Sequence, residues 1–156
     1  MSRISVVAVA VLVLVSSWVA AGESRMVTGQ VLYVPAYSEI PYGEGKRQLQ
    51  LATTLTIRNT DRTLPITVKT ADYYDARGKL IHSYVEALRT LQPLETFDVV
   101  VAESDRRAGV SASFMVEWTS ESPVRPPLVE TIMVGTAGSQ GVSFVGSARV
   151  LEETAE

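Results

Sequence analysis

The chain has 156 residues, of which 46% are hydrophobic and 20% charged, with a net charge of −3 and no cysteine. That length suits one domain with a core of its own. The dispersed charges exclude the basic stripe of a nucleic-acid-binding or anionic-lipid-binding surface. The lack of cysteine excludes disulfides, thiol catalysis and thiolate metal sites.

The first 21 residues are typical of a secretory signal peptide. Arg3 precedes an apolar run from Ile4 to Val19, and small residues follow it. We expect cleavage after Ala21, with cleavage after Gly22 as the alternative, because small residues then occupy the positions that the peptidase recognises. Removal of Arg3 with this leader changes the net charge from −3 to −4. The expected location is the periplasm or the outside of the cell.

An uncleaved membrane anchor is the alternative to a signal peptide. Residues 4–21 form a stretch of about 18 residues, the lower limit for a membrane-spanning helix. Ser16 and Ser17 interrupt this stretch, and its end is rich in small residues, so cleavage is favoured. The rest of the sequence has no second long apolar run, so we expect no membrane span after cleavage.

Residues 22–156 are predicted to form one all-β domain. Short runs rich in β-branched and aromatic residues are separated by Gly, Pro, Asn and Asp. Apolar and polar residues alternate over 49–57, 97–101 and 114–118, which turns one face of each strand toward a core. The other strands are predicted at 66–74, 79–85, 128–134 and 142–150. The segment 27–37 is expected to pair at a sheet edge, interrupted by Pro35.

The connections between these strands carry turn signals. Asp75-Ala-Arg-Gly78 suits a type I turn in a hairpin, with positive φ at Gly78. A second turn is predicted at 59–62, and three prolines predict an extended connection over 122–127. One short helical turn is allowed at 86–89, and the acidic tail 152–156 is expected to fray.

This spacing of strands and turns indicates the fold class. About eight strands without a convincing helix predict a single antiparallel β-sandwich of the Ig-like or fibronectin-like type. The domain organisation expected is a signal peptide at 1–21 and a β-sandwich domain at 22–156.

Three stretches resemble a known family. They are Val31-Leu-Tyr-Val-Pro-Ala-Tyr-Ser38, then Leu55-Thr-Ile-Arg-Asn-Thr60 with Asp72-Tyr-Tyr-Asp-Ala-Arg-Gly-Lys-Leu80, and Gly135-Thr-Ala-Gly-Ser-Gln-Gly-Val-Ser-Phe144. Together they resemble the bacterial exported family called Domain of Unknown Function 3124, over about residues 30–150. The resemblance implies export and a small domain, and it supplies no activity, ligand or catalytic residue. The middle stretch is also similar to Ig-like and fibronectin-like bacterial domains, a likeness that carries no function.

No catalytic, cofactor-binding or metal-binding residue is assigned from the sequence, and no cofactor is expected. His82 is the one histidine, so a Ser-His-Asp triad would need it, yet it lies within a predicted strand. Asp72 and Asp75 are the nearest pair of carboxylates for acid–base chemistry, but Asp75 is needed in its turn. Loop acids such as Asp61 and Asp105 lack the repeated Asp-x-Asp spacing of a calcium site.

The candidates for contact with a ligand or partner are six residues. Exposed tyrosines offer a flat apolar ring with a polar tip, although the same side chains can instead fill a core. The glycine-rich loop 135–141 lacks the Lys and the following helix of a phosphate loop, so we expect a hairpin loop whose tip can touch a partner. The six residues are Tyr33, Tyr37, Tyr42, Gly138, Ser139 and Gln140.

These patterns favour an exported, non-catalytic binding or interaction module of the bacterial cell envelope. The expected partner is a protein, peptide or glycan, and not a nucleic acid. A structural subunit of an envelope assembly is the alternative. An envelope hydrolase with an unrecognised site is a further alternative; it requires Asp72 or His82 in a deep pocket.

Overall fold

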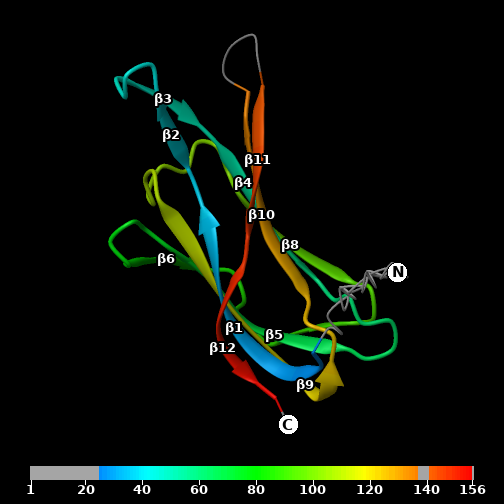
Figure 1. Ribbon diagram of the computed structural model, residues 1–156. Helices are drawn as coiled ribbons and strands as arrows, with labels where there is room; N and C mark the ends of the chain where they lie inside the picture. The colour runs from blue at the N-terminus through cyan, green and yellow to red at the C-terminus, as the bar shows by residue number, and fades with distance from the viewer. Residues whose placement is uncertain (1–24, 137–140, 156) are drawn as a thin grey trace, which may run out of the picture.

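The computed structural model describes residues 25–136 and 141–155, and within them the chain forms twelve β-strands and no helix (Figure 1). The predicted all-β class is confirmed, whereas the expected number of about eight strands is wrong. The difference arises because short polar hairpins and a late break add strands that apolar alternation does not reveal. The strands are β1 Val27–Ala36, β2 Glu39–Tyr42, β3 Arg47–Gln50, β4 Ala52–Arg58, β5 Ile66–Tyr74, β6 Leu80–Ser83, β7 Arg89–Leu91, β8 Thr96–Val101, β9 Ala112–Val124, β10 Leu128–Gly135, β11 Val142–Ser147 and β12 Arg149–Thr154.

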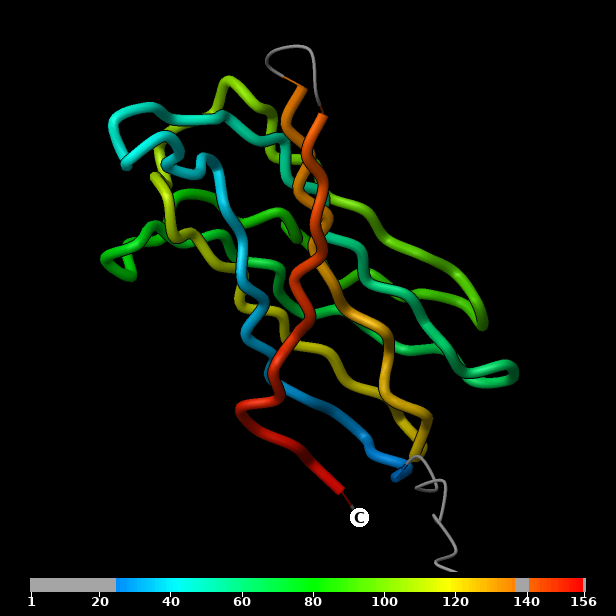
Figure 2. The backbone as a smooth tube through the Cα atoms, turned by 45° about the horizontal axis from the view of Figure 1, so that its top comes forward, coloured from blue at the N-terminus to red at the C-terminus, as the bar shows by residue number. Residues whose placement is uncertain are grey.

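The strands form three antiparallel sheets. A six-stranded sheet has the order β12-β1-β9-β5-β6, with β7 also pairing with β5. A four-stranded sheet has the order β11-β10-β4-β8, and β2 pairs with β3 alone. The tube in Figure 2 shows the strands of the two larger sheets running along the length of the molecule.

One hydrophobic core lies between the two larger sheets. Trp118, Phe114 and Tyr73 are its largest members from the six-stranded sheet, and Leu55 and Ile57 come from the four-stranded sheet. The predicted alternation over 97–101 and 114–118 is confirmed, because every second residue of these strands points inward. Burial of each large apolar side chain contributes about 1.5–3 kcal/mol, which suits a chain without disulfide bonds.

The hairpin between β5 and β6 has the predicted turn. Gly78 has a φ of 78° and donates its backbone N–H to the Asp75 carbonyl at 2.9 Å. The Asp75 carboxylate accepts the backbone N–H groups of Arg77 at 2.8 Å and Lys79 at 2.9 Å. These bonds, led by that from Lys79, hold the pKa of Asp75 below its usual value, so the acid is fixed as a turn residue.

β1 is not the edge strand that Pro35 suggests. It lies between β12 and β9, but its pairing with β12 ends at Tyr33. Pro35 has no N–H to donate, and it lies beyond the last pair with β12, where none is required. Its carbonyl instead accepts a hydrogen bond from the hydroxyl of Thr131 at 2.6 Å.

The single strand predicted over 142–150 is two strands in different sheets. β11 pairs with β10 and β12 pairs with β1, so the chain passes from one sheet to the other at Ala148. The predicted fraying of residues 152–156 is wrong for Glu152, Glu153 and Thr154, which pair with residues 29–31 of β1.

Three further local predictions differ from the structure. β9 continues through Pro123 to Val124, so the extended connection covers only 125–127 instead of 122–127. The register of β1 against β9 shifts here, with residues 120–123 of β9 opposite Thr28, and this irregularity accommodates the proline. Bends at residues 84, 86 and 87 take the place of the helical turn allowed at 86–89. The strand predicted over 49–57 is broken at Leu51, so residues 49–50 end β3 and β4 begins at Ala52, and β2 has no counterpart among the predicted strands.

Candidate binding site

The β2–β3 hairpin projects at one end of the molecule (Figure 1). Its tip follows Tyr42 and contains Gly43, Glu44 and Gly45, whose φ values are 57°, 60° and 75°. Glycine adopts this left-handed region at little cost, so the Gly-Glu-Gly sequence suits a tight reversal. Tyr42 is 47% exposed beside this tip, where it is open to a partner.

The base of this hairpin is fixed to both larger sheets. The Ser38 hydroxyl lies 2.7 Å from the Tyr73 hydroxyl of β5, and burial raises the pKa of that tyrosine. The backbone N–H of Leu51 donates to the Ser38 carbonyl at 2.8 Å. Thr53 of β4 donates its hydroxyl to the Tyr37 carbonyl at 2.9 Å, so the hairpin emerges from a rigid base.

A second hairpin, β10–β11, packs beside the first one. Gly135 ends β10, and a Cβ atom there would lie only 2.8 Å from Leu51 Cδ2 and 3.0 Å from the Gln50 carbonyl oxygen. The ring of Tyr37 meets the ring of Phe144 of β11 edge-on, with centroids 5.8 Å apart. The two hairpins therefore support one another at the same end of the molecule, which we call the hairpin end; it comprises Tyr37, Ile40, Tyr42, Val142 and Phe144.

The hairpin end combines exposed apolar groups with paired charges. Val142 is 39% exposed, and Tyr37, Ile40 and Phe144 are half-buried. Glu39 at the base accepts from Arg106 at 3.1 Å. This arrangement can bury a ring or an aliphatic side chain of a partner while charges at its margin stay in water.

The predicted contact residues divide between two places. Tyr37 and Tyr42 belong to the hairpin end, whereas Tyr33 lies on the outer face of β1, between Met115 of β9 and Arg149 of β12. Tyr33 is 39% exposed there and points away from the core. Gly138, Ser139 and Gln140 lie outside the described residues.

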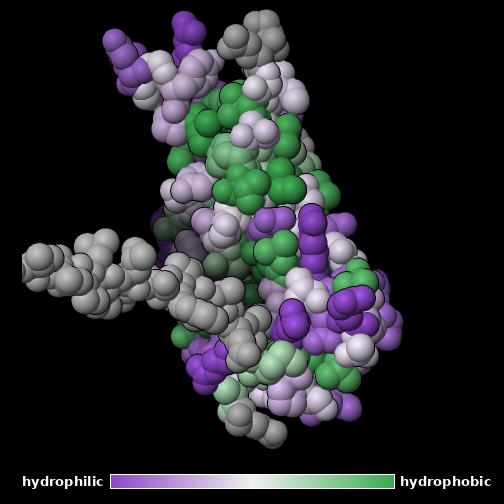
Figure 3. Space-filling view, turned by 45° about the vertical axis from the view of Figure 1, so that its right-hand side comes forward, coloured by the Kyte–Doolittle hydropathy of each residue, from purple (hydrophilic) through white to green (hydrophobic). Residues whose placement is uncertain are grey.

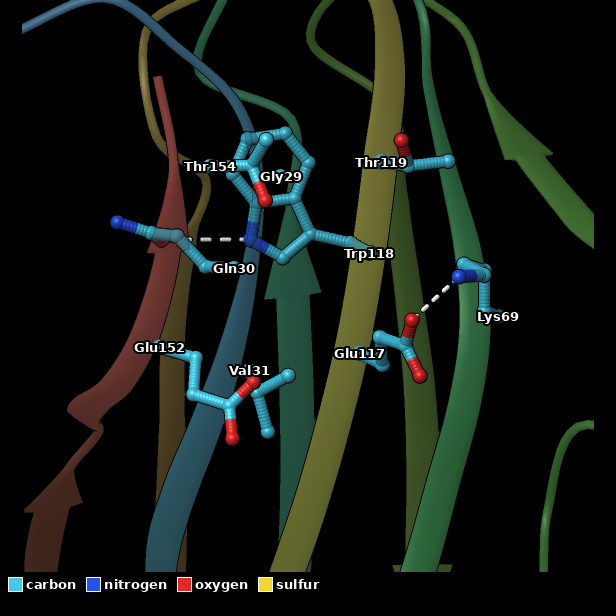
Figure 4. A pocket seen from close by; sticks show the side chains of 9 residues that line it. All are labelled: Gly29, Gln30, Val31, Lys69, Glu117, Trp118, Thr119, Glu152 and Thr154. Carbon is cyan, nitrogen blue, oxygen red and sulfur yellow. Dashed lines mark hydrogen bonds and ion pairs between the residues drawn. The ribbon is translucent and has the colours of Figure 1, made fainter.

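Sequence reasoning missed a hollow on the outer face of the six-stranded sheet (Figure 4). Its volume is about 160 Å³. Gly29 forms part of its floor, and a Cβ atom there would lie 2.9 Å from the Trp118 carbonyl oxygen. The hollow is lined by Gly29, Gln30, Val31, Lys69, Glu117, Trp118, Thr119, Glu152 and Thr154.

Strand irregularities surround this hollow. The register of β5 against β9 shifts between Val68 and Thr70, which places Lys69 beside Glu117, and the two form an ion pair. The register of β1 shifts against β9 near Gly29 and against β12 after Val31. Bulges often lie beside functional sites, but these also have a structural use because they accommodate the close approach at Gly29. The hollow is small and shallow, and it suits a single polar group.

A chain of polar contacts leads from the buried Trp118 and Gln30 of the same sheet to its exposed edge. The Trp118 indole N–H donates to Gln30 Oε1 at 3.3 Å, and Gln30 Nε2 donates to Glu153 at 2.8 Å. Glu153 also pairs with Arg25 at 3.2 Å. These bonds satisfy a buried amide and connect the two ends of the described chain.

The candidates for acid–base chemistry are not brought together around a cavity. Asp72 and His82 lie on the neighbouring strands β5 and β6, and the His82 ring meets the Tyr84 ring edge-on at 4.5 Å. A second hollow, of about 210 Å³, lies near Pro65 and Ser120. Neither Asp72 nor His82 lines this hollow or the one at Gly29.

The loop acids Asp61 and Asp105 instead organise their own loops. Asp105 binds the Arg107 side chain through both carboxylate oxygens, at 2.9 and 2.6 Å, which lowers its pKa. Within 25–136 and 141–155, no three His, Asp or Glu side chains gather as metal ligands would. The same residues contain no helix of the length and apolarity needed to cross a membrane.

The strands define an all-β protein of several antiparallel sheets. The chain belongs to the family described as protein of unknown function DUF3124, which matches residues 29–151 and confirms the resemblance. No curated protein matches the chain. Among solved structures it is similar to one titled Crystal Structure of Thermotoga maritima 1070, with 9% identity, 81% of this chain and 94% of that chain covered, and a TM-score of 0.43.

Proposed function

We propose that this protein is an exported, non-catalytic binding module of the bacterial cell envelope, built as a β-sandwich with Ig-like connections. The leader-like pattern of residues 1–21 supports export to the periplasm or beyond. The shared core of two sheets supports a sandwich, a fold that presents loops and hairpins on a rigid body.

The observation that carries the proposal is the packing of two hairpins at one end. The close approach at Gly135 and the contact between Tyr37 and Phe144 hold the hairpins side by side. Tyr42 then stands exposed on a supported hairpin, where its ring can stack on a sugar or pack against a peptide. The proposed partner is therefore a protein, peptide or glycan of the envelope.

A photo-crosslinking amino acid in place of Tyr42 tests this proposal. The full chain is expressed in its bacterial host and irradiated in intact cells. Leu80 of β6 is the matched control, because it is also an apolar residue with 47% exposure but lies on a different part of the fold. We expect a crosslinked product from position 42 and much less from position 80. Equal yields at the two positions, or no product at position 42, would contradict binding at the hairpin end.

Export has a separate test. Cell fractionation of the untagged full chain should place it in the periplasm or the medium, shortened by 21 residues. A full-length chain in the cytoplasm would contradict the proposed location without bearing on the hairpin end.

Two alternatives receive different support. A hydrolase needs a pocket that holds a catalytic group, and neither hollow described above includes Asp72 or His82. A structural subunit is favoured by a specific observation, two adjacent rows of uncharged residues on the outer face of the four-stranded sheet, which include Val145, Val134 and Val100.

A further inference from the structure

The outer face of the four-stranded sheet has rows of residues fixed by strand register. One row runs across all four strands as Val145, Ile132, Thr54 and Val100. The adjacent row, toward the hairpin end, contains Ser143, Val134 and Ala52. Neither row contains a charged residue. We call these two rows the apolar strip.

The apolar strip is open to solvent. Val100 is 63% exposed, Val145 57% and Val134 39%. In Figure 3, apolar side chains gather on this side of the molecule below the grey loop, and charged side chains lie further down. A contiguous apolar surface of this kind marks an interaction site more often than scattered exposed residues do.

Charges begin abruptly in the next row. This row contains Ser147, Glu130, Thr56 and Asp98, and Arg58 follows Thr56 along β4. Arg58 lies 3.7 Å from Glu130 within the same molecule. The face therefore has an apolar half and a polar half.

We propose that a second copy of this chain covers this face. A two-fold axis parallel to the strands, between β10 and β4, sets β11 of each copy over β8 of the other. Val145 of each copy then faces Val100 of the other copy, and Ile132 faces Thr54. The exposed valines cover each other, and the larger Ile132 packs on the smaller Thr54 near the axis. Each contact occurs twice, as an isologous interface requires.

The polar half supports the same arrangement. Under that axis, β4 of one copy lies over β10 of the other, so the row that contains Thr56 faces Glu130 of the second copy. Arg58 approaches the same carboxylate from the second copy. Opposite charges therefore meet across the interface, and this fixes the register of the two copies.

The size of the face indicates a weak dimer. With strands about 4.8 Å apart and outward residues about 6.8 Å apart along each strand, four rows cover roughly 500 Å² of flat area. A standard interface buries about 800 Å² on each partner, so this one lies at the lower end of stable association. The dimer should accordingly depend on concentration.

A thiol crosslink tests the second copy directly. The chain has no cysteine, so the variant Thr54→Cys carries one thiol, close to the two-fold axis. The full chain is expressed in its host and treated in intact cells with a short bis-maleimide. The matched control is Thr70→Cys, also half-buried but on the outer face of the six-stranded sheet. We expect a product of twice the chain mass, containing only this chain, from position 54 and not from position 70.

A charge exchange then tests the facing of the strands. In the Thr54→Cys chain, Val100→Lys should reduce the crosslinked fraction at least about tenfold, because two ammonium groups enter the apolar contact. Adding Val145→Glu should restore it, since the new carboxylate faces the new lysine. Equal crosslinking at positions 54 and 70, a product with another protein, or no effect of Val100→Lys would each overturn the second-copy interface. Circular dichroism of each purified variant confirms that it is folded.

Discussion

Asp61 organises the loop after β4 through four hydrogen bonds. Its carboxylate accepts the backbone N–H groups of Thr63 at 2.9 Å, Leu64 at 3.0 Å and Arg125 at 3.3 Å, and the Thr63 hydroxyl at 3.1 Å. These donors stabilise the ionised form. Led by the Thr63 backbone N–H, they lower the pKa of Asp61 from 3.8 to about 2.

Replacement of Asp61 should destabilise the fold. Asp61→Ala leaves these donors without an acceptor, so we expect a loss of about 2 kcal/mol in the free energy of unfolding. The exposed acid Asp98 is the control, and Asp98→Ala should change stability by less than about 0.5 kcal/mol. Guanidinium unfolding curves of the two variants measure the difference. Equal losses would show that the Asp61 network is not needed.

The same carboxylate predicts a dependence of stability on pH. Between about pH 4 and pH 2 the unfolded chain binds a proton at Asp61 and the folded chain does not, so stability falls as the pH falls through this window. Asp61→Asn cannot titrate and should flatten this part of the curve. Urea midpoints of both proteins at pH 5, 4, 3 and 2.5 give the comparison, and parallel curves would contradict the assignment.

Leu94 is a second residue whose local chemistry is unusual. It follows Pro93 in the turn 92–95, closed by the Glu95 backbone N–H donating to the Gln92 carbonyl at 3.0 Å, and has a φ of 64°. A type II turn has glycine at this position because a side chain strains the left-handed backbone. Leu94 is also 67% exposed, so it contributes little to the core.

Leu94→Gly should therefore stabilise the protein, by about 0.5–1 kcal/mol. Leu88 is the control, because it is 71% exposed but does not have a positive φ. Leu88→Gly should be neutral or destabilising, because it only adds freedom to the unfolded chain. Thermal unfolding of both variants by calorimetry decides the matter, and a lower midpoint for Leu94→Gly would refute the strain argument.

At the scale of elements, the passage from β11 to β12 depends on a glycine. A Cβ atom on Gly146 would lie 2.6 Å from the Thr131 hydroxyl and 2.9 Å from the Pro35 carbonyl oxygen. The two neighbouring strands already meet here, since Thr131 donates its hydroxyl to Pro35. A side chain at Gly146 must separate them.

Gly146→Ala should accordingly cost about 2 kcal/mol or more, as overpacking against backbone does. Gly141→Ala is the matched control in the same hairpin, because among the described residues the nearest atom to its Cβ would be 3.9 Å away. Chemical unfolding of the two variants gives the two costs. A Gly146→Ala protein as stable as the control would mean that the strands separate easily.

The elements that sequence predicts well are those whose own side chains alternate. Along β8 and residues 114–118 of β9 every second residue is apolar and faces the core, and Leu55 and Ile57 do the same in β4. β2 and β3 escape prediction because they are four residues long, largely polar, and pair only with each other. The division of 142–150 into two strands escapes prediction because Gly146 and Ala148 are small residues that fit either strand. Only the close approach of Gly146 to Pro35 in the structure marks the place where the chain leaves one sheet for the other.

The candidate site is predictable only in part, for the same reason. Tyrosine content points to Tyr37 and Tyr42, which lie at the hairpin end, and to Tyr33, which lies elsewhere. Nothing in the sequence indicates that the two hairpins pack together, because the contact at Gly135 joins residues more than eighty positions apart. The hollow over Gly29 is likewise formed by four strands and three register shifts that no local pattern encodes.

At the scale of the whole molecule, β12 closes the six-stranded sheet at one side. It pairs with β1, and Glu153 completes the polar chain that begins at the Trp118 indole. Ala148 donates its backbone N–H to the Val129 carbonyl of β10 at 3.2 Å, so the strand remains tied to both sheets as it crosses. The C-terminal strand is therefore structural rather than a free tail.

Truncation after Ser147 should destabilise the entire fold. It exposes the edge of β1, leaves Gln30 without Glu153 and opens the core near Trp118, so we expect a lower unfolding midpoint and aggregation through the new edge. Truncation after Thr154 keeps every β1–β12 pair and is the control. Far-ultraviolet dichroism on heating and light scattering distinguish the two proteins. If the chain ending at Ser147 unfolds at the same temperature as the control and stays in solution, β12 is dispensable, and the core between the sheets is sufficient for folding.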